Sequence, residues 1–190
     1  MKITCVLGSP RKNGNSATLA DHFLQKIAAA GAETRAFHLN TLQFKGCQAC
    51  YGCKQKSEIC VLRDDLSEVL DAVRAADVLV MATPTYFGEV SSQLKAFIDR
   101  TFSFLVPDFH TSPQPSRLQP GKTLVFIITQ GHPDEAIFAD IFPRYQQFFS
   151  WFGYAHFHLI RVCGANPDDR IMERTDVARR IQETVDKILA

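Results

Sequence analysis

Apolar and polar positions follow two alternating patterns along the chain. Short strand-like segments, typical of buried parallel strands, cover residues 3–7, 33–39, 77–83, 122–129 and 156–162. Stretches in which apolar residues recur at helical spacing cover residues 19–28, 66–73, 94–102, 137–152 and 177–188. The pattern therefore predicts a chain of five strand–helix units.

This alternation predicts a parallel sheet with helices on both faces, joined by right-handed crossovers. Five such units in 190 residues suit the flavodoxin-like α/β fold, a three-layer sandwich with a five-stranded parallel sheet in the order 2-1-3-4-5. We expect a single domain over residues 1–190. Ligands of such sheets bind beyond the carboxyl ends of the strands, where the strand order reverses. Here that point lies between the strands ending at Leu7 and Thr83.

Composition and charge narrow the class of protein. Apolar residues make up 46% and charged residues 22% of the chain, a balance typical of globular domains. No apolar run approaches the roughly 20 residues that span a bilayer, and the N-terminus lacks the apolar core of a signal peptide. We therefore expect a cytoplasmic protein with no membrane partner. A formal net charge of +1, without a basic stripe, argues against nucleic acid as a partner.

A loop of small polar residues, Gly8–Ser16, follows the first strand. A loop that enters a helix N-terminus presents free backbone N–H groups and the positive end of the helix dipole, and Arg11 adds a charged donor. The loop matches neither the nucleoside-triphosphate loop nor the dinucleotide fingerprint. It indicates a phosphate site of another kind, or a plain turn in which Ser16 caps the helix.

Two segments in register resemble the NAD(P)H-dependent FMN reductases and iron–sulfur flavoproteins. One is Gly8–Ser16; the other is Pro84–Ser91 together with the helix Leu94–Arg100 that follows it. The resemblance covers about residues 1 to 105, and the C-terminal third matches only in general pattern. It implies a flavodoxin-like fold that binds FMN.

The resemblance also implies roles for individual residues. The FMN phosphate would be held by Ser9, Arg11, Asn13, Asn15 and Ser16. The isoalloxazine and ribityl chain would be wrapped by Pro84, Thr85, Tyr86, Phe87 and Gly88, although Tyr86 and Phe87 would equally suit the core. A third loop, after the fourth strand, would bring Gly131 and His132 to the flavin. We expect Asp99 and Arg100 to form a structural or subunit contact.

No acid–base or nucleophilic constellation stands out, so no catalytic side chain is assigned. That scarcity is consistent with flavin chemistry, which the cofactor itself performs. The resemblance implies an oxidoreductase in which NAD(P)H, as a transient reductant, reduces FMN, and reduced FMN passes electrons to a flavin, a quinone or a similar small-molecule acceptor. It also implies a homodimer or homotetramer, for which the aromatic helix around Phe148 and Trp151 is a candidate interface; the same aromatics would also suit a core.

Four cysteines crowd into a segment expected to be a loop, residues 43–61: Cys47, Cys50, Cys53 and Cys60. Four thiolates suit a [4Fe–4S] cluster or a tetrahedral zinc site. Their spacing resembles that of iron–sulfur flavoproteins, whose cluster passes single electrons to FMN and for which ferredoxin is the partner. A redox disulfide and a segment without any metal remain alternatives, as does a domain with an empty flavin site that only mediates association.

Overall fold

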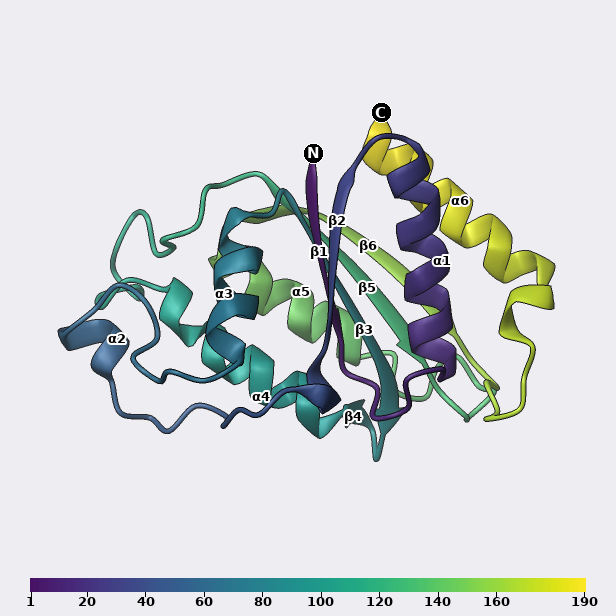
Figure 1. Cartoon of the computed structure of the whole chain (residues 1–190), viewed down its shortest axis with the longest axis horizontal. Coiled ribbons are helices and arrows are strands. Elements are labelled where there is room, and N and C mark those ends of the chain that lie inside the picture. Colours follow the sequence, from purple (N-terminus) through teal and green to yellow (C-terminus); the bar gives the residue numbers. More distant parts are fainter.

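The computed structural model describes residues 1–190 and has a parallel sheet at its centre, flanked by helices (Figure 1). Five strands form the sheet in the order β2-β1-β3-β5-β6, with every neighbouring pair parallel. Their bounds are β1 Lys2–Leu7, β2 Glu33–His38, β3 Val78–Tyr86, β5 Lys122–Thr129 and β6 Tyr154–Val162. A two-residue strand, β4 (Glu89–Val90), pairs antiparallel with the end of β3. With β4 set aside, the predicted order 2-1-3-4-5 is confirmed.

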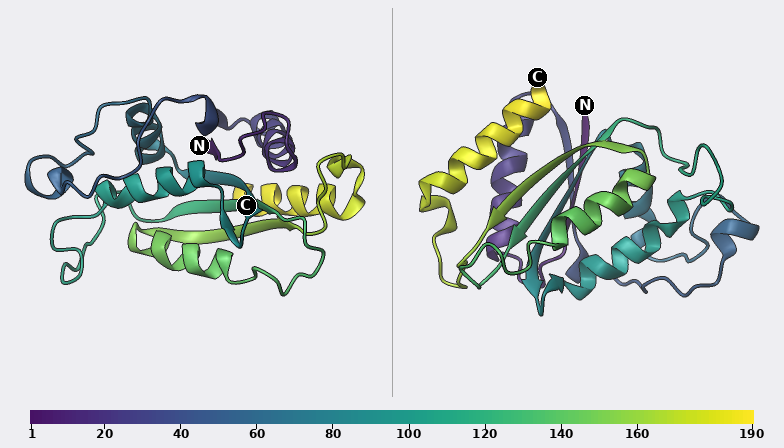
Figure 2. Two further views of the ribbon diagram at one scale, coloured as in Figure 1. Left: turned by 90° about the horizontal axis from the view of Figure 1, so that it is seen from below. Right: turned by 180° about the vertical axis from the view of Figure 1, so that it is seen from behind.

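Helices cover both faces of the sheet (Figure 2). The longer ones are α1 Asn15–Ala29, α3 Leu66–Ala75, α4 Ser92–Arg100, α5 Ile141–Trp151 and α6 Thr175–Leu189. The short ones are α2 Gly52–Gln55 and the 3-10 turns η1 Leu39–Thr41, η2 Thr101–Phe104 and η3 Ile171–Glu173. None of these helices is both long and apolar enough to cross a membrane.

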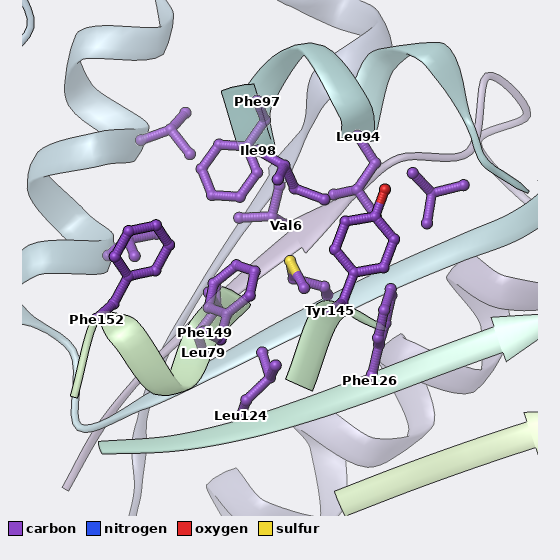
Figure 3. Packing of buried hydrophobic residues seen from close by; sticks show 14 of the residues in the cluster. Val6, Leu79, Leu94, Phe97, Ile98, Leu124, Phe126, Tyr145, Phe149 and Phe152 are labelled. Atoms are coloured by element: carbon purple, nitrogen blue, oxygen red, sulfur yellow. The ribbon is translucent and has the colours of Figure 1, made fainter. Parts of the chain in front are cut away.

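Two apolar cores form because successive side chains of a strand point to opposite faces. On one face, Val6 of β1 and Leu79 of β3 pack with α3, α4 and α5, and Figure 3 shows Phe97 of α4 and Phe149 of α5 among the side chains of this core. On the other face, Cys5 and Val80 pack with α1 and α6. The sheet is therefore covered on both faces, as the continuous apolar strands predict.

Three elements differ from the expectation. The fourth long helix begins at Ile141 rather than near residue 137, because residues 131–140 form a loop in which Phe138 has a left-handed backbone, φ 64°. β3 continues to Tyr86 because β4 folds back onto its end. The cysteine segment, expected to be a loop, contains the single turn α2.

Candidate functional site

The loop between β1 and α1 ends in a helix N-terminus that no side chain caps. Gly14 is the N-cap residue of α1, and the first turn of the helix contains no acidic side chain. Five backbone N–H groups here have no backbone acceptor in the chain: those of Lys12, Asn13, Asn15, Ser16 and Ala17. Unpaired N–H groups and the helix dipole both attract negative charge. The turn is therefore suited to an anion such as a phosphate group.

Two of the side chains expected to hold a phosphate are engaged within the protein instead. Ser9 is buried, and its Oγ accepts the N–H of Arg11 at 3.1 Å. Asn15 is also buried, and its Nδ2 donates to the carbonyl oxygen of Asn166 at 2.7 Å. These two side chains brace the loop and orient its backbone donors. The other three expected residues lie in the same turn, two of them exposed and the last buried: Arg11, Asn13 and Ser16.

Gly8, at the start of this loop, packs against the N-terminus of α4. A Cβ at Gly8 would lie 2.7 Å from both Leu94 Cβ and Ser91 Oγ, a distance that real Cβ atoms do not tolerate. Ser91 Oγ donates to the carbonyl oxygen of Gly8 at 2.7 Å and caps α4 by accepting the N–H of Leu94 at 3.3 Å. The glycine is thus needed for close approach to α4, and Ser91 joins the two predicted flavin loops.

The β3–β4 hairpin forms the second predicted flavin loop. Its turn residues Phe87 and Gly88 both have left-handed backbones, φ 51° and 80°, as a tight two-residue hairpin turn requires. The Phe87 side chain is fully exposed. A Cβ at Gly88 would lie 3.1 Å from the ring of Phe138, so the hairpin lies against the loop that follows β5.

One polar atom at the base of this hairpin has no partner within the chain. Pro84 is buried, Thr85 is half-buried and Tyr86 is 45% exposed. The Oγ1 of Thr85 is shielded from solvent and has no hydrogen-bond partner. Because a buried hydroxyl without a partner is costly, this atom marks a position where a ligand group would be stabilising.

The third loop, after β5, is organised by Gln130 rather than by the residues expected there. Gln130 is buried; its Nε2 donates to the carbonyl oxygens of His132 and Asp134 at 2.9 and 3.0 Å, and its Oε1 accepts Arg161 Nε at 3.1 Å. Gly131 and His132 are exposed, and His132 Nδ1 accepts the N–H of Asp134. Sequence reasoning missed Gln130, although a polar residue directly after a buried apolar strand was a usable signal.

The structure brings all three loops to the carboxyl edge of the sheet, after β1, β3 and β5 (Figure 1). The first two meet through Ser91 and Gly8, and the last two meet through Phe138 and Gly88. This is the edge at which the strand order reverses, where ligands bind in open α/β sheets.

The four clustered cysteines line one cavity of about 100 Å³ beside α2 and the C-terminal end of α4, away from the sheet (Figure 1). Cys47 and Cys50 are exposed, Cys60 is half-buried and Cys53 is buried; all are free thiols. No three His, Cys, Asp or Glu side chains converge closely enough to hold a metal ion. The predicted ligands therefore share a cavity but do not form a preassembled metal site.

Arg100 is fully buried beside this cavity and uses all five of its N–H donors. Its Nε donates to Cys60 Sγ at 3.0 Å. Its Nη1 donates to the Lys45 carbonyl oxygen and to Asp64 Oδ2, both at 2.8 Å. Its Nη2 donates to the Leu62 carbonyl oxygen at 3.3 Å and to Asp64 Oδ1 at 3.2 Å. Arg100 thus binds both ends of the cysteine segment, and the expectation of a structural contact is met within the chain.

The charges of this pair stabilise each other. Burial acts to raise the pKa of Asp64, but hydrogen bonds from Arg100 and from the Lys45 N–H outweigh it and hold that pKa below its usual value. Burial likewise acts to lower the pKa of Arg100, and its contacts with Asp64 and Cys60 raise it instead. Both groups are therefore charged at neutral pH.

Two more cations fasten the cysteine segment to η2 and the residue after it. Lys54 Nζ donates to the carbonyl oxygens of Phe102 and Leu105 and lies 4.0 Å from the centre of the Phe102 ring. Arg117 Nη1 donates to the carbonyl oxygens of Cys53 at 3.0 Å and Ser103 at 2.9 Å. The segment is thus held by three cations, one of which contacts a sulfur atom.

Comparison with known families identifies the family of this chain. The family model for NADPH-dependent FMN reductase matches residues 1–141. The chain belongs to the NADPH-dependent FMN reductase family. The matched region contains the loops that follow β1, β3 and β5 and the cysteine segment.

Among curated relatives of this family member are several iron–sulfur flavoproteins. One from Archaeoglobus fulgidus is 33% identical over 135 residues, which are 71% of this chain and 58% of that protein. One from Methanocaldococcus jannaschii is 38% identical over 101 residues, which are 53% of this chain and 52% of that protein. The chain spans about half the length of these relatives.

Solved structures share the fold of this family member. An FMN-dependent NADH-azoreductase from Bacillus anthracis, in complex with FMN, has a TM-score of 0.76 at 15% identity and covers 100% of both chains. An NAD(P)H:quinone oxidoreductase from Methanothermobacter marburgensis has a TM-score of 0.73 at 16% identity, covering 96% of this chain and 94% of the other. At such identities the likeness establishes the flavodoxin-like fold alone.

The residues of this family member fit FMN, the cofactor in the family's name. The α1 N-terminus offers unpaired N–H groups to a phosphate without a competing acid, and Thr85 Oγ1 lacks a partner nearby on the same edge. The cysteine cavity fits an iron–sulfur cluster in its donor chemistry, because its lining contains four thiols and a cation but no carboxylate or imidazole.

Proposed function

We propose that the protein is an FMN-dependent oxidoreductase, reduced by NAD(P)H, that passes electrons to a flavin, a quinone or a similar small-molecule acceptor. The observation that carries the proposal is the uncapped N-terminus of α1, with five unpaired N–H groups beside the β3–β4 hairpin. Membership of the NADPH-dependent FMN reductase family supports it, as does the FMN in the azoreductase of the same fold.

In this proposal the chain binds and orients the flavin, which itself accepts the hydride and releases the electrons. The five unpaired N–H groups of the loop hold the phosphate, with Arg11, Asn13 and Ser16 as side-chain donors and with Ser9 and Asn15 bracing the loop. Pro84, Thr85, Tyr86 and Phe87, with the Gly88 turn, line the flavin ring and ribityl chain, and Thr85 Oγ1 gains a partner. Gly131 and His132 border the ring from the third loop.

A second candidate is an iron–sulfur flavoprotein that moves electrons between ferredoxin, a cluster and FMN. It is favoured by the four cysteines that line one cavity and by the names of the curated relatives. In it Cys47, Cys50, Cys53 and Cys60 hold a [4Fe–4S] cluster, and their side chains close around it on binding.

We propose a cytoplasmic homodimer or homotetramer. All six cysteines are free, which suits a reducing compartment. On α5, Phe148 and Trp151 are 37% and 42% exposed and border a groove of about 460 Å³ between α4 and α5, so a second copy has an apolar surface to cover.

The test is anaerobic purification followed by counts of flavin and iron and by reduction assays. Rapid bleaching of the flavin band by NADH or NADPH, without iron, supports the reductase. Bleaching by reduced ferredoxin alone, with near four irons per chain, supports the second candidate. A colourless protein that stays colourless after incubation with FMN contradicts both.

A further inference from the structure

Arg100 makes Cys60 different from the other three clustered cysteines. The Nε–H of Arg100 points at Cys60 Sγ at 3.0 Å, and Arg100 makes no hydrogen bond to Cys47, Cys50 or Cys53. The guanidinium cannot turn away, because its other four donors are bound. They donate to Asp64 and to the carbonyl oxygens of Lys45 and Leu62. The N–H···S contact is therefore fixed by the surrounding structure.

The ion pair between Arg100 and Asp64 is held in place by further hydrogen bonds. Asp64 accepts hydrogen bonds from both terminal nitrogens of Arg100. It also accepts hydrogen bonds from the backbone N–H groups of Lys45 and Leu66, each at 3.2 Å. The side chain of Arg100 has no exposed area, and that of Asp64 has 16%. Such a pair keeps a full positive charge and a directed donor next to one sulfur atom of the cavity.

We propose that Arg100 is a positioning residue that holds Cys60 as a ligand of the iron–sulfur cluster and raises the midpoint potential of that cluster through its N–H···S hydrogen bond. The inference rests on the second candidate function. Reduction of the cluster by one electron adds one negative charge and moves no proton. A donor directed at a ligand sulfur stabilises the more negative, reduced form, and hydrogen bonds to the sulfurs are known to set cluster potentials.

A matched pair of substitutions tests this role. Arg100→Lys keeps a buried cation for Asp64. It loses the planar guanidinium, which can donate to Cys60 and to the other acceptors at the same time. Arg117→Lys makes the same chemical change at a guanidinium that donates only to backbone carbonyl oxygens, that of Cys53 in the cysteine segment and that of Ser103 in η2. The proteins are reconstituted anaerobically with iron and sulfide, and the cluster is titrated with dithionite and followed by electron paramagnetic resonance.

We expect the midpoint potential to shift to lower values in Arg100→Lys and to stay at the wild-type value in Arg117→Lys. Asp64→Asn provides an independent arm, also where Arg100→Lys does not fold. It leaves the N–H···S donor in place but removes the compensating negative charge, so the midpoint potential should shift to higher values. If Arg100 only held the cysteine segment in place, the variants would lose iron, and the midpoint potential would not shift in opposite directions in Arg100→Lys and Asp64→Asn.

The outcomes separate this inference from the function on which it rests. Wild-type protein without bound iron after reconstitution overturns both the cluster and the role of Arg100. A cluster in the wild type whose potential is unchanged in both Arg100→Lys and Asp64→Asn overturns only the role of Arg100. An equal shift in Arg117→Lys and Arg100→Lys also overturns it.

Discussion

Ser91 Oγ donates a 2.7 Å hydrogen bond to the carbonyl oxygen of Gly8. The contact is fully buried and spans 83 positions in the sequence. Ser91 also caps α4, and its own N–H is accepted by Thr83 Oγ1 at 3.0 Å. The proposed phosphate loop and the helix that follows the proposed flavin hairpin are therefore fastened as one unit, which positions the phosphate and ring ends of one ligand relative to each other.

Ser91→Ala should lower both stability and FMN affinity. The substitution leaves the Gly8 carbonyl oxygen buried without a partner and removes the cap of α4, so we expect a loss of about 2 kcal/mol in the free energy of unfolding. Urea unfolding and a fluorescence titration with FMN measure the two effects. Ser92→Ala is the control, because Ser92 is exposed and its Oγ contacts only its neighbour Gln93. Equal stability of the two variants would contradict the assigned role of Ser91.

Arg11→Ala should weaken FMN binding without affecting the fold. Arg11 is exposed, and its side chain makes no hydrogen bond or ion pair within the chain, so its loss removes only a donor to the proposed phosphate. A charge-assisted hydrogen bond contributes about 1.5 kcal/mol or more, so we expect roughly a tenfold rise in the FMN Kd.

Arg35→Ala is the matched control for this measurement, since Arg35 is an exposed cation on β2 paired with Glu68. Its FMN Kd should equal that of the wild type. Riboflavin, which has no phosphate, should bind Arg11→Ala and wild type equally. A rise in Kd for riboflavin as large as that for FMN would locate Arg11 away from the phosphate.

The stability that Asp64 contributes to the folded protein should be lost in acid. Its pKa in the folded state is held below the usual value of about 3.9. Its ionised form therefore contributes stability that is fully present above that usual value and is lost as the pH falls through the lower, folded-state pKa. Asp64→Asn leaves the Arg100 charge buried without its partner, so we expect a loss of about 3 kcal/mol near neutral pH. Urea unfolding from pH 7 to pH 3 should show the two proteins converging in acid; a constant difference would rule out the ion pair as the source.

Each of the four clustered cysteines should be needed for full iron content. Serine at Cys47, Cys50, Cys53 or Cys60 removes one thiolate from the proposed cluster, so iron and sulfide bound after anaerobic reconstitution should fall well below the wild-type count. Cys163→Ser is the control, because Cys163 lies near the end of β6 and does not line the cysteine cavity. The cluster assignment fails if all five variants bind as much iron as the wild type.

The sheet order and the meeting of the predicted loops at one edge of the sheet could be predicted from the sequence, because both follow from the alternation of buried strands and helices. The continuous apolar run at β3 pairs in the sheet with β1, which precedes the glycine loop, as predicted. The role of Gly8 was less readable. The missing Cβ of Gly8 makes room for Leu94 and Ser91, which are far from it in the sequence.

Features set by tertiary contacts escaped the sequence. The start of α5 was misplaced because Ile137 and Phe138 continue the apolar spacing of the helix, yet Phe138 bends into a left-handed conformation and packs over Gly88. The bracing role of Gln130 depends on Arg161, which lies 31 residues away. The link between Arg100 and Cys60 likewise joins elements 40 residues apart, and no local pattern signals it.

The central claim is that the N-terminus of α1 holds the phosphate of a flavin, and the most direct measurement compares the affinities of the apoprotein for FMN and for riboflavin. The two ligands share the ring and ribityl chain and differ only in the phosphate. The account predicts that FMN binds roughly a hundredfold more tightly or better, since several charged hydrogen bonds of about 1.5 kcal/mol or more each depend on that group. Equal affinities for FMN and riboflavin would contradict it.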